Sequence, residues 1–153
     1  MAQNRLVVSL MSKSHTFWYR LLGGAGLTGS FGRGPILLLT TTGRKSGKQR
    51  TTPLIYGRDG DNIMVVASNG GDDSDPAWWR NLKANPDATI QIKHETRRVR
   101  AEQANDAEKA RLWPEMTKVY PTYDDYQKRT SRTIPLVILK PESVARAEPG
   151  GGA

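Results

Sequence analysis

Short runs of apolar and β-branched residues, separated by polar and glycine-rich turns, dominate the chain from residue 35 onward. Runs of this length and composition predict strands. We expect six of them, over residues 35–42, 51–58, 62–68, 89–93, 97–104 and 133–140. Their short connections favour antiparallel pairing, and Pro53 places its strand at an edge or a bulge. The pattern predicts a mainly β protein with flanking helices, folded as a small closed or half-closed barrel.

Four segments have the apolar spacing of helices instead: residues 10–22, 75–82, 106–119 and 122–130. Asp75 is a candidate N-cap, with a proline at the first helical position after it. Asn105 and Glu108 have the spacing of a capping box. Pro114 lies inside the third segment and predicts a kink or a break there.

The chain divides into three parts on this basis. Residues 1–34 contain an amphipathic helix and a glycine-rich loop, residues 35–140 form the barrel domain, and residues 141–153 form a mobile tail. The first helix either covers one end of the core or contacts an anionic lipid surface. No apolar run is long enough to span a membrane, and the N-terminus lacks the pattern of a signal peptide.

Basic residues are concentrated in the first part of the chain. The net charge is +8; residues 1–58 contain nine Lys/Arg and no acid, whereas residues 59–153 contain fourteen Lys/Arg and fifteen Asp/Glu. Such a distribution implies an anionic partner, which could be a phosphorylated or polycarboxylate small molecule, an acidic membrane surface or nucleic acid. The chain has no cysteine and only two histidines, which fits a cytoplasmic protein and predicts no metal site.

The loop over residues 43–50 has the sharpest chemical signature. It contains two glycines, a serine and four cations, Arg44, Lys45, Lys48 and Arg50. Glycine lets backbone N–H groups turn toward an anion, and arginine binds phosphate and carboxylate oxygens with two donors. A solvated basic hairpin tip is the alternative. The P-loop spacing is absent, because Gln49 follows where that motif needs serine or threonine.

Three other segments could form a site. Ser68, at the end of a strand of small residues, is a hydrogen-bond donor to a ligand or a turn serine; no base accompanies it at the spacing of a nucleophile. Trp78 and Trp79 point about 100° apart on a helix, so we expect only one of them in the core. Three tyrosines recur every third residue and either pack in the core or close over a pocket: Tyr120, Tyr123 and Tyr126.

The segments in this order resemble the deazaflavin-dependent nitroreductase family of actinobacteria, the A-type flavin/deazaflavin oxidoreductases with a split β-barrel, FMN-binding-like fold. The resemblance covers residues 15–141. It rests on the segments LLTTTGRKSG (38–47), RTTPL (50–54), VASNGG (66–71), PAWWRNLKANP (76–86), WP (113–114), YPTYDDY (120–126) and RTIP (132–135).

The resemblance implies coenzyme F420, an 8-hydroxy-5-deazaflavin with a phosphate and a polyglutamate tail. It implies that the cofactor is bound by Arg44, Lys45, Ser46, Gly47, Lys48, Arg50, Thr51, Pro53, Val66, Ala67, Ser68, Asn69, Ala77, Trp78 and Trp79. It places Ser68, Tyr120, Tyr123 and Tyr126 at the substrate. Ile55 and Asn69 stand where the nitroimidazole-reducing member has tyrosine and lysine, which disfavours nitro compounds as substrates.

We therefore expect an F420-dependent reductase that transfers a hydride to quinones, to α,β-unsaturated carbonyl or lactone compounds, or to nitro compounds. An FMN-dependent oxidoreductase on the same barrel is the alternative enzyme. A non-catalytic module for anionic membrane or nucleic acid is the alternative from another class, although the aromatic residues and cations lie in separate segments, so nucleic acid is not expected. The enzyme would be a monomer or a homodimer in the cytoplasm, with peripheral contact at the membrane as an option.

Overall fold

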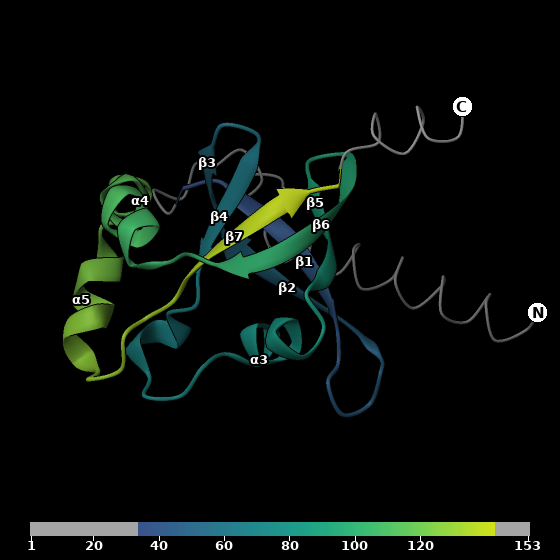
Figure 1. Ribbon diagram of the computed structural model, residues 1–153, viewed down its shortest axis with the longest axis horizontal. Helices are drawn as coiled ribbons and strands as arrows, with labels where there is room; N and C mark the ends of the chain where they lie inside the picture. The colour runs from purple at the N-terminus through teal and green to yellow at the C-terminus, as the bar shows by residue number, and fades with distance from the viewer. Residues whose placement is uncertain (1–33, 143–153) are drawn as a thin grey trace, which may run out of the picture.

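The computed structural model describes residues 34–142, which form one seven-stranded antiparallel sheet with three α-helices around it (Figure 1). The strands are β1 (Ile36–Thr42), β2 (Gln49–Ile55), β3 (Gly57–Asp59), β4 (Asn62–Val66), β5 (Asp87–Ile92), β6 (Glu95–Gln103) and β7 (Leu136–Pro141). The helices are α3 (Ala77–Ala84), α4 (Asp106–Val119) and α5 (Thr122–Arg129), and a 3-10 turn, η1 (Asn69–Gly71), follows β4.

The order of the strands requires the sheet to curl. It runs β2-β1-β5-β6-β7-β4-β3, which places β2 and β3 at opposite edges. Only Tyr56 separates these two strands in the chain, so the two edges must lie close together. The Tyr56 amide donates to the carbonyl of Pro35, 3.1 Å away. The sheet is therefore a half-closed barrel, as the sequence predicts, and Pro53 lies in the edge strand β2, opposite Leu38.

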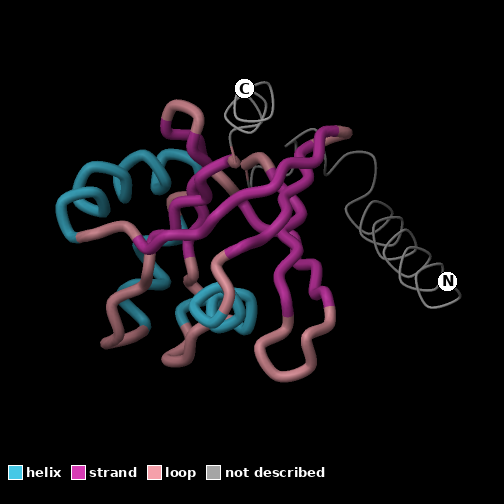
Figure 2. Tube along the Cα trace, turned by 45° about the vertical axis from the view of Figure 1, so that its right-hand side comes forward, coloured by secondary structure: helices cyan, strands magenta, loops and turns pink. Residues whose placement is uncertain are grey.

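Strands β4 and β7 are buried on both faces, because successive side chains alternate between two cores. Ile63 and Val65 of β4 belong to the core inside the barrel. Met64 and Val66 belong to a second core, which α4 and α5 complete on the other face of the strands. Figures 1 and 2 show these two helices together beside the sheet, with α3 below it at the end of the barrel.

Both tryptophans of α3 enter the core inside the barrel, so the expectation that only one would do so is wrong. Trp78 is 6% exposed and Trp79 is 5% exposed. Their rings meet edge to face, with centroids 6.4 Å apart. Because α3 lies across the end of the barrel, the wide apolar opening accommodates two side chains that point about 100° apart.

The predicted elements occur in the predicted order, but several of their ends differ from the prediction. The strand expected over residues 51–58 is divided at Tyr56 into β2 and β3, and the strand expected over residues 62–68 ends at Val66. The last strand starts at residue 136 instead of 133. The reason is local, since the backbone amide of Ile134 donates to the Gln127 side chain, 3.0 Å away, rather than to a strand.

At the helices, the structure confirms the capping box, excludes a break at Pro114 and contradicts the cap expected at Asp75. The capping box forms, because Asn105 Oδ1 accepts from the Glu108 amide at 2.8 Å and Glu108 Oε1 accepts from the Asn105 amide at 3.0 Å. Pro114 lies inside α4 without ending it. Asp75 does not cap α3, whose N-cap is Pro76; its carboxylate accepts from Lys83 at 2.9 Å and is also bound by an arginine described below.

The helix expected over residues 10–22, the glycine-rich loop before residue 34 and the tail beyond residue 142 lie outside the described residues. The described sheet starts at residue 36 and ends at residue 141. Within residues 34–142, no helix is long and apolar enough to cross a membrane.

Candidate active site

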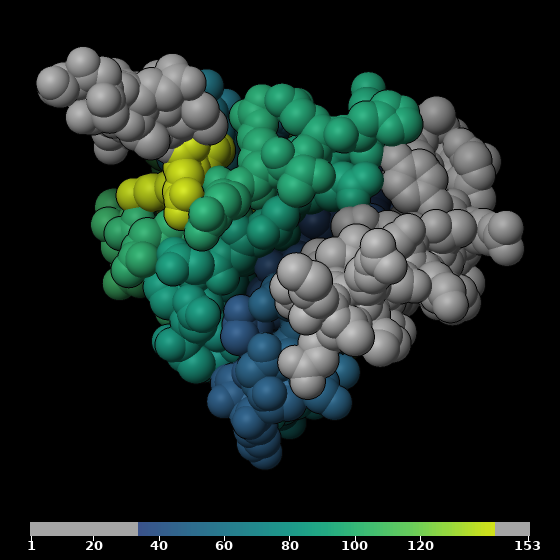
Figure 3. All heavy atoms as spheres, turned by 90° about the vertical axis from the view of Figure 1, so that its right-hand side faces the viewer, coloured from purple at the N-terminus to yellow at the C-terminus, as the bar shows by residue number. Residues whose placement is uncertain are grey.

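The basic loop is a tight hairpin tip between β1 and β2. The Gly43 amide donates to the carbonyl of Lys48 at 2.7 Å, and the Gly47 amide donates to the carbonyl of Gly43 at 2.8 Å. Gly47 has a φ of 71°, which favours glycine. A side chain on Gly43 would lie 2.8 Å from Ser46 Oγ, so this turn also needs glycine. The loop projects from the sheet on the side where α3 lies, and Figure 3 shows it in blue at one end of the molecule.

The cations of this loop have no acidic partner among the described residues. Eight other lysines and arginines in residues 34–142 form ion pairs with carboxylates within 4.0 Å. Arg44, Lys45, Lys48 and Arg50 form none of these pairs, and all four are exposed. A group of exposed and uncompensated cations on a fixed turn is suited to bind an anion.

Asn81 of α3 anchors the first of these cations. Its Oδ1 accepts from both the backbone amide and the Nη1 of Arg44, at 3.2 Å and 3.1 Å. Its Nδ2 donates to Thr41 Oγ1 of β1 at 3.1 Å. Asn81 and Thr41 are 4% and 1% exposed. The buried amide therefore connects the helix, the strand and the basic loop, and it fixes the direction of the Arg44 side chain.

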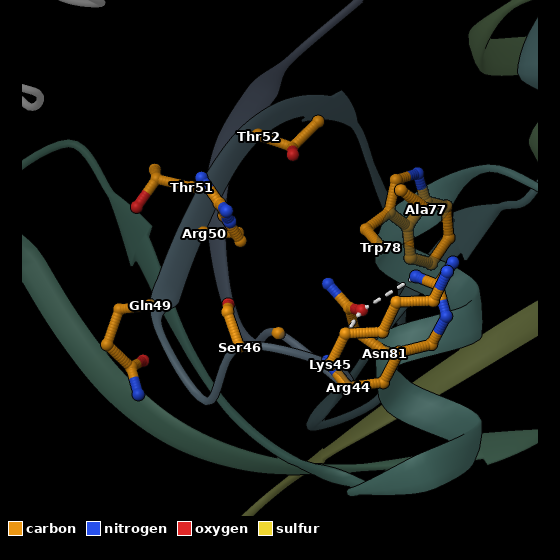
Figure 4. A pocket seen from close by; sticks show the side chains of 11 residues that line it. Arg44, Lys45, Ser46, Gln49, Arg50, Thr51, Thr52, Ala77, Trp78 and Asn81 are labelled. Atoms are coloured by element: carbon orange, nitrogen blue, oxygen red, sulfur yellow. Dashed lines mark hydrogen bonds between the residues drawn. The ribbon is translucent and has the colours of Figure 1, made fainter.

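Loop, strand and helix enclose a hollow of about 560 Å³, which we call the basic hollow (Figure 4). Its size is within the range of small-molecule sites. In Figure 4, Arg44, Asn81 and Trp78 lie on one side, and Arg50 and Thr52 lie on the other. The lining residues are Gly43, Arg44, Lys45, Ser46, Gln49, Arg50, Thr51, Thr52, Ala77, Trp78 and Asn81.

A second hollow, of about 400 Å³, lies at the end of β4, and we call it the strand-end hollow. It shares Thr52, Ala77 and Trp78 with the basic hollow, so the two are continuous around the tryptophan. Its lining is less charged and consists of Thr52, Leu54, Val66, Ser68, Asn69, Gly70, Pro76, Ala77 and Trp78. A flat, largely apolar group with a few polar atoms suits this lining.

The turn at this hollow has an unusual backbone. Asn69, Gly70 and Gly71 have φ values of 47°, 64° and 84°. The turn is closed by a hydrogen bond from the Gly71 amide to the Ser68 carbonyl at 2.9 Å. Ser68 is half-buried, and its hydroxyl has no hydrogen-bond partner among the described residues. That hydroxyl is available to a ligand.

The three tyrosines form one cluster, which comes from two helices. Tyr120 follows the last residue of α4, and Tyr123 and Tyr126 lie on α5. The ring centroids of Tyr120 and Tyr123 are 5.0 Å apart, and the hydroxyls of Tyr120 and Tyr126 are 3.2 Å apart. Tyr123 is 5% exposed, and burial, followed by the two neighbouring phenols, raises the pKa of its hydroxyl above the usual range. Tyr123 therefore keeps its proton, whereas the other two are half-buried.

The cluster stands beside the turn of the strand-end hollow. A Cβ on Gly71 would lie 3.0 Å from the carbonyl oxygen of Tyr126, which shows how closely α5 packs on η1. The tyrosines themselves line neither hollow. Tyr123 belongs to the second core, and Tyr120 and Tyr126 pack against that core, so the structure brings α5 next to η1 without placing the three phenols in the walls.

The remaining residues expected at a site divide between surface and core. Arg44, Lys45, Ser46, Arg50, Thr51, Val66, Ser68, Asn69, Ala77 and Trp78 line one or both hollows. Gly47, Lys48 and Pro53 lie on the same hairpin but outside both linings. Ala67 is fully buried and Trp79 is a core residue, so their side chains face away from either hollow.

Sequence reasoning missed two polar residues that shape the site. Asn81 could have been found, because it lies three residues after Trp78 and thus on the apolar face of α3. Arg132 stands in the segment RTIP that carries the family resemblance, but nothing local indicates its partners, which are 57 to 65 residues away in the chain. Both act through the loops that they bind.

The half-barrel thus carries a basic hollow without acidic partners that leads into a less charged hollow, an arrangement that suits an anionic, partly planar ligand. Residues 11–141 match the sequence model of the F420H(2)-dependent quinone reductase family. The chain is 48% identical over 111 residues to an F420H(2)-dependent quinone reductase of Mycobacterium tuberculosis. The aligned region covers 71% of this chain and 74% of that protein. The chain belongs to this family.

Solved structures agree with the sequence comparison. An F420H2-dependent reductase named FDR-A is 38% identical, with a TM-score of 0.65 over 69% of this chain and 94% of the other. A structure described as a domain-swapped dimer is 33% identical, with the same TM-score over 85% and 98% of the chains. The heme storage protein HutZ of Vibrio cholerae, 17% identical with a TM-score of 0.57 over 71% and 82%, shares the fold alone. These similarities confirm the predicted split β-barrel.

Proposed function

We propose that this protein is an F420H2-dependent oxidoreductase whose electron acceptor is a quinone. The observation that carries the proposal is the pairing of two continuous hollows, one lined by cations without acidic partners and one lined mainly by apolar and small residues, in a chain of this family. The family name favours a quinone over the enone and nitro compounds that the sequence also allows.

The residues present fit coenzyme F420. Its phosphate and glutamate carboxylates need several cationic donors, which Arg44, Lys45 and Arg50 supply on a rigid turn. Its ring system needs a flat and weakly polar site, and the strand-end hollow supplies Leu54 and Trp78 for stacking and packing. When bound in reduced form, the coenzyme supplies a hydride, so the protein itself needs neither a metal nor a nucleophile.

The side chains around the strand-end hollow then have defined tasks. A quinone that accepts a hydride also needs one proton to become a hydroquinone. The free hydroxyl of Ser68 can donate a hydrogen bond to the oxygen that becomes negative. The hydroxyl pair of Tyr120 and Tyr126 lies outside the lining, and it would supply the proton to a substrate that extends from the hollow toward α5. Tyr123, buried and with a raised pKa, packs against both rings and holds them in place.

The test is the oxidation of F420H2 by menadione, followed by absorbance with the purified protein. The proposal expects protein-dependent oxidation with F420H2 and much slower oxidation when reduced FMN replaces it. Absence of oxidation with F420H2 over a panel of quinones contradicts the proposal. Oxidation that proceeds equally well with reduced FMN supports the alternative cofactor.

The place of the cofactor tail is tested by charge removal. The double substitution Lys45→Gln and Arg50→Gln is expected to weaken F420 binding by about tenfold per residue, because each removes a charge-assisted hydrogen bond. The loss should shrink at high salt. The matched control is Arg98→Gln with Lys140→Gln, which removes the same charge from β6 and β7, where each cation is already paired. Equal losses in the two variants would refute the placement.

Two predictions about partners remain part of this proposal. A homodimer is supported by the relative that is described as a domain-swapped dimer, and sedimentation equilibrium tests it. Contact of residues 10–22 with a membrane lies outside the described residues. Flotation with anionic vesicles would test that contact in the full chain.

A further inference from the structure

Arg132 binds four acceptors in the segment that forms the strand-end hollow. Its Nη2 donates to the carbonyls of Ala67 and Ser68 at 3.1 Å and 3.0 Å. Its Nε donates to the carbonyl of Asp72 at 2.8 Å, and its Nη1 donates to Asp75 Oδ1 at 3.1 Å. The side chain is 16% exposed. One guanidinium thus binds both ends of the turn that carries Ser68.

The backbone around Arg132 is fixed on its other side to helix α5. The Arg132 carbonyl accepts from Gln127 Nε2 at 2.8 Å. Thr130, at the end of α5, donates through its hydroxyl to Asp73 Oδ1 at 2.7 Å. The same hydroxyl accepts from the Arg132 amide at 3.2 Å. Arg132 therefore lies at the junction of the helix that carries Tyr123 and Tyr126 with the turn that carries Ser68.

The turn has few hydrogen bonds of its own besides that of Gly71: the Asp72 amide donates to the Asn69 carbonyl at 3.1 Å, and Asn69 Nδ2 donates to the Ser74 carbonyl at 3.0 Å. Asn69, Gly70 and Gly71 all have positive φ values, and Asn69 pays a steric cost in that region. Three successive residues with this backbone form no regular ladder, and two of them are glycines with large freedom in an untethered chain. Only a planar group with several donors reaches three carbonyls and a carboxylate together, so lysine cannot replace arginine here.

We propose that Arg132 is a positioning residue, which holds the Ser68 turn at a fixed place relative to the tyrosine-bearing helix. This inference rests on the proposed function, which assigns the hydrogen bond to the quinone oxygen to the Ser68 turn and the delivery of the proton to the tyrosines. Loss of the tether frees the Ser68 hydroxyl and backbone to move away from the reacting oxygen. The basic hollow, which Arg132 does not touch, keeps its geometry.

The substitutions are Arg132→Ala and Arg132→Lys, with Arg111→Ala as the matched control. Arg111 forms a two-donor pair with Asp59, at 3.1 Å and 3.0 Å, and so joins α4 to β3 away from both hollows. The first measurement is amide hydrogen exchange in the ligand-free protein. We expect the Gly71 and Asp72 amides to exchange at least about tenfold faster in both Arg132 variants. The amides of residues 43–48 should exchange at the wild-type rate in these variants, and so should the Gly71 and Asp72 amides in Arg111→Ala.

The second measurement is kinetic. With menadione, Arg132→Ala should lower kcat by at least about tenfold while the F420 dissociation constant changes less than threefold, since the transition state is more sensitive to misplacement than cofactor binding is. Millimolar guanidinium should restore part of kcat in Arg132→Ala and none in a Ser68→Ala protein. A loss of general stability alone would not be rescued in this way.

The outcomes separate the two proposals. Unchanged exchange at residues 71 and 72 overturns the positioning role, whatever the activity. Faster exchange with wild-type kcat overturns the link between the tether and the reaction. If exchange is faster in the variant but the wild-type protein oxidises no F420H2, the proposed function is overturned, and the link between this junction and the reaction is overturned with it. Equal kinetic losses in Arg132→Ala and Arg111→Ala also overturn the inference.

Discussion

Replacing Asn81 by alanine separates the stability of the barrel from the affinity for the anionic ligand. The wild-type amide makes three hydrogen bonds, two to Arg44 and one to Thr41. Alanine removes all three and leaves the helix backbone unchanged, since alanine is a good helix former. The variant therefore frees the Arg44 side chain to change direction and leaves the charge of the basic hollow unchanged.

The burial of Thr41 and the exposure of Arg44 set the expected losses of folding stability and of affinity for F420. Thr41 is 1% exposed, so the loss of its donor costs about 1–3 kcal/mol of folding stability. The Arg44 groups are exposed and regain water, so their loss adds little to unfolding. The freed Arg44 side chain must be ordered again when the ligand binds, which costs about 1–2 kcal/mol. This corresponds to a dissociation constant for F420 that rises about five- to thirtyfold.

Thr41→Val is the matched control, because it removes the buried hydrogen bond and leaves both bonds between Asn81 and Arg44. Urea unfolding should show a similar loss of stability for the two variants, and fluorescence titration with F420 should show weaker binding for Asn81→Ala alone. Wild-type affinity in Asn81→Ala would refute the anchoring argument. Equal weakening in Thr41→Val would refute it as well, because the effect would then follow stability and not the direction of Arg44.

Three further substitutions test the packing around the site. Burial raises the pKa of Tyr123, so the folded state binds the phenol proton more tightly than the unfolded state does. The resulting stabilisation is present below about pH 10 and is lost as the pH rises further. In urea titrations at several pH values, Tyr123→Phe should therefore reduce the fall of the unfolding free energy above pH 10 by about 1.4 kcal/mol per pH unit relative to wild type. Gly71→Ala should destabilise the protein by about 1–3 kcal/mol, since its φ is 84° and its Cβ would meet α5 at 3.0 Å, whereas Gly60→Ala, with a positive φ and open space, should cost less. Pro114→Ala should raise the thermal midpoint, because proline removes one hydrogen bond inside α4; an unchanged or lower midpoint would show that the ring packs better than the helix bond it prevents.

Most of the fold could be predicted from local patterns. Apolar runs over residues 35–42 and 62–68 identified β1 and β4, and the spacing of Asn105 and Glu108 identified the start of α4, because both signals depend on residues close in the chain. The curl of the sheet was less accessible. It follows from the short passage at Tyr56 between the two edges, and the sequence there reads as one continuous strand.

The site could be predicted in part for the same physical reason. The four loop cations are neighbours in the chain, so their charge was visible at once, and so was the end of β4 with its small residues. The tether of Arg132 spans more than fifty residues and has no local pattern. The two tryptophans were misjudged because helical periodicity gives the angle between side chains but not the width of the surface that a helix covers.

The structure separates the loop cations from Ser68: Arg44, Lys45 and Arg50 line one hollow, and Ser68 lines the other. Trp78 is the common wall of the two hollows; the loop cations lie on one side of it and Ser68 lies on the other. The four loop cations are absent from the lining of the strand-end hollow, so we expect them to act more strongly on a bound anionic tail than on a hydride acceptor in that hollow. Under the proposed function, we expect affinity to depend on the β1–β2 hairpin and turnover to depend on η1 with α5. If the cofactor binds as proposed, this division would let the loop bind a strongly anionic tail without stabilising negative charge on the ground state of the ring, where such stabilisation would slow the loss of a hydride.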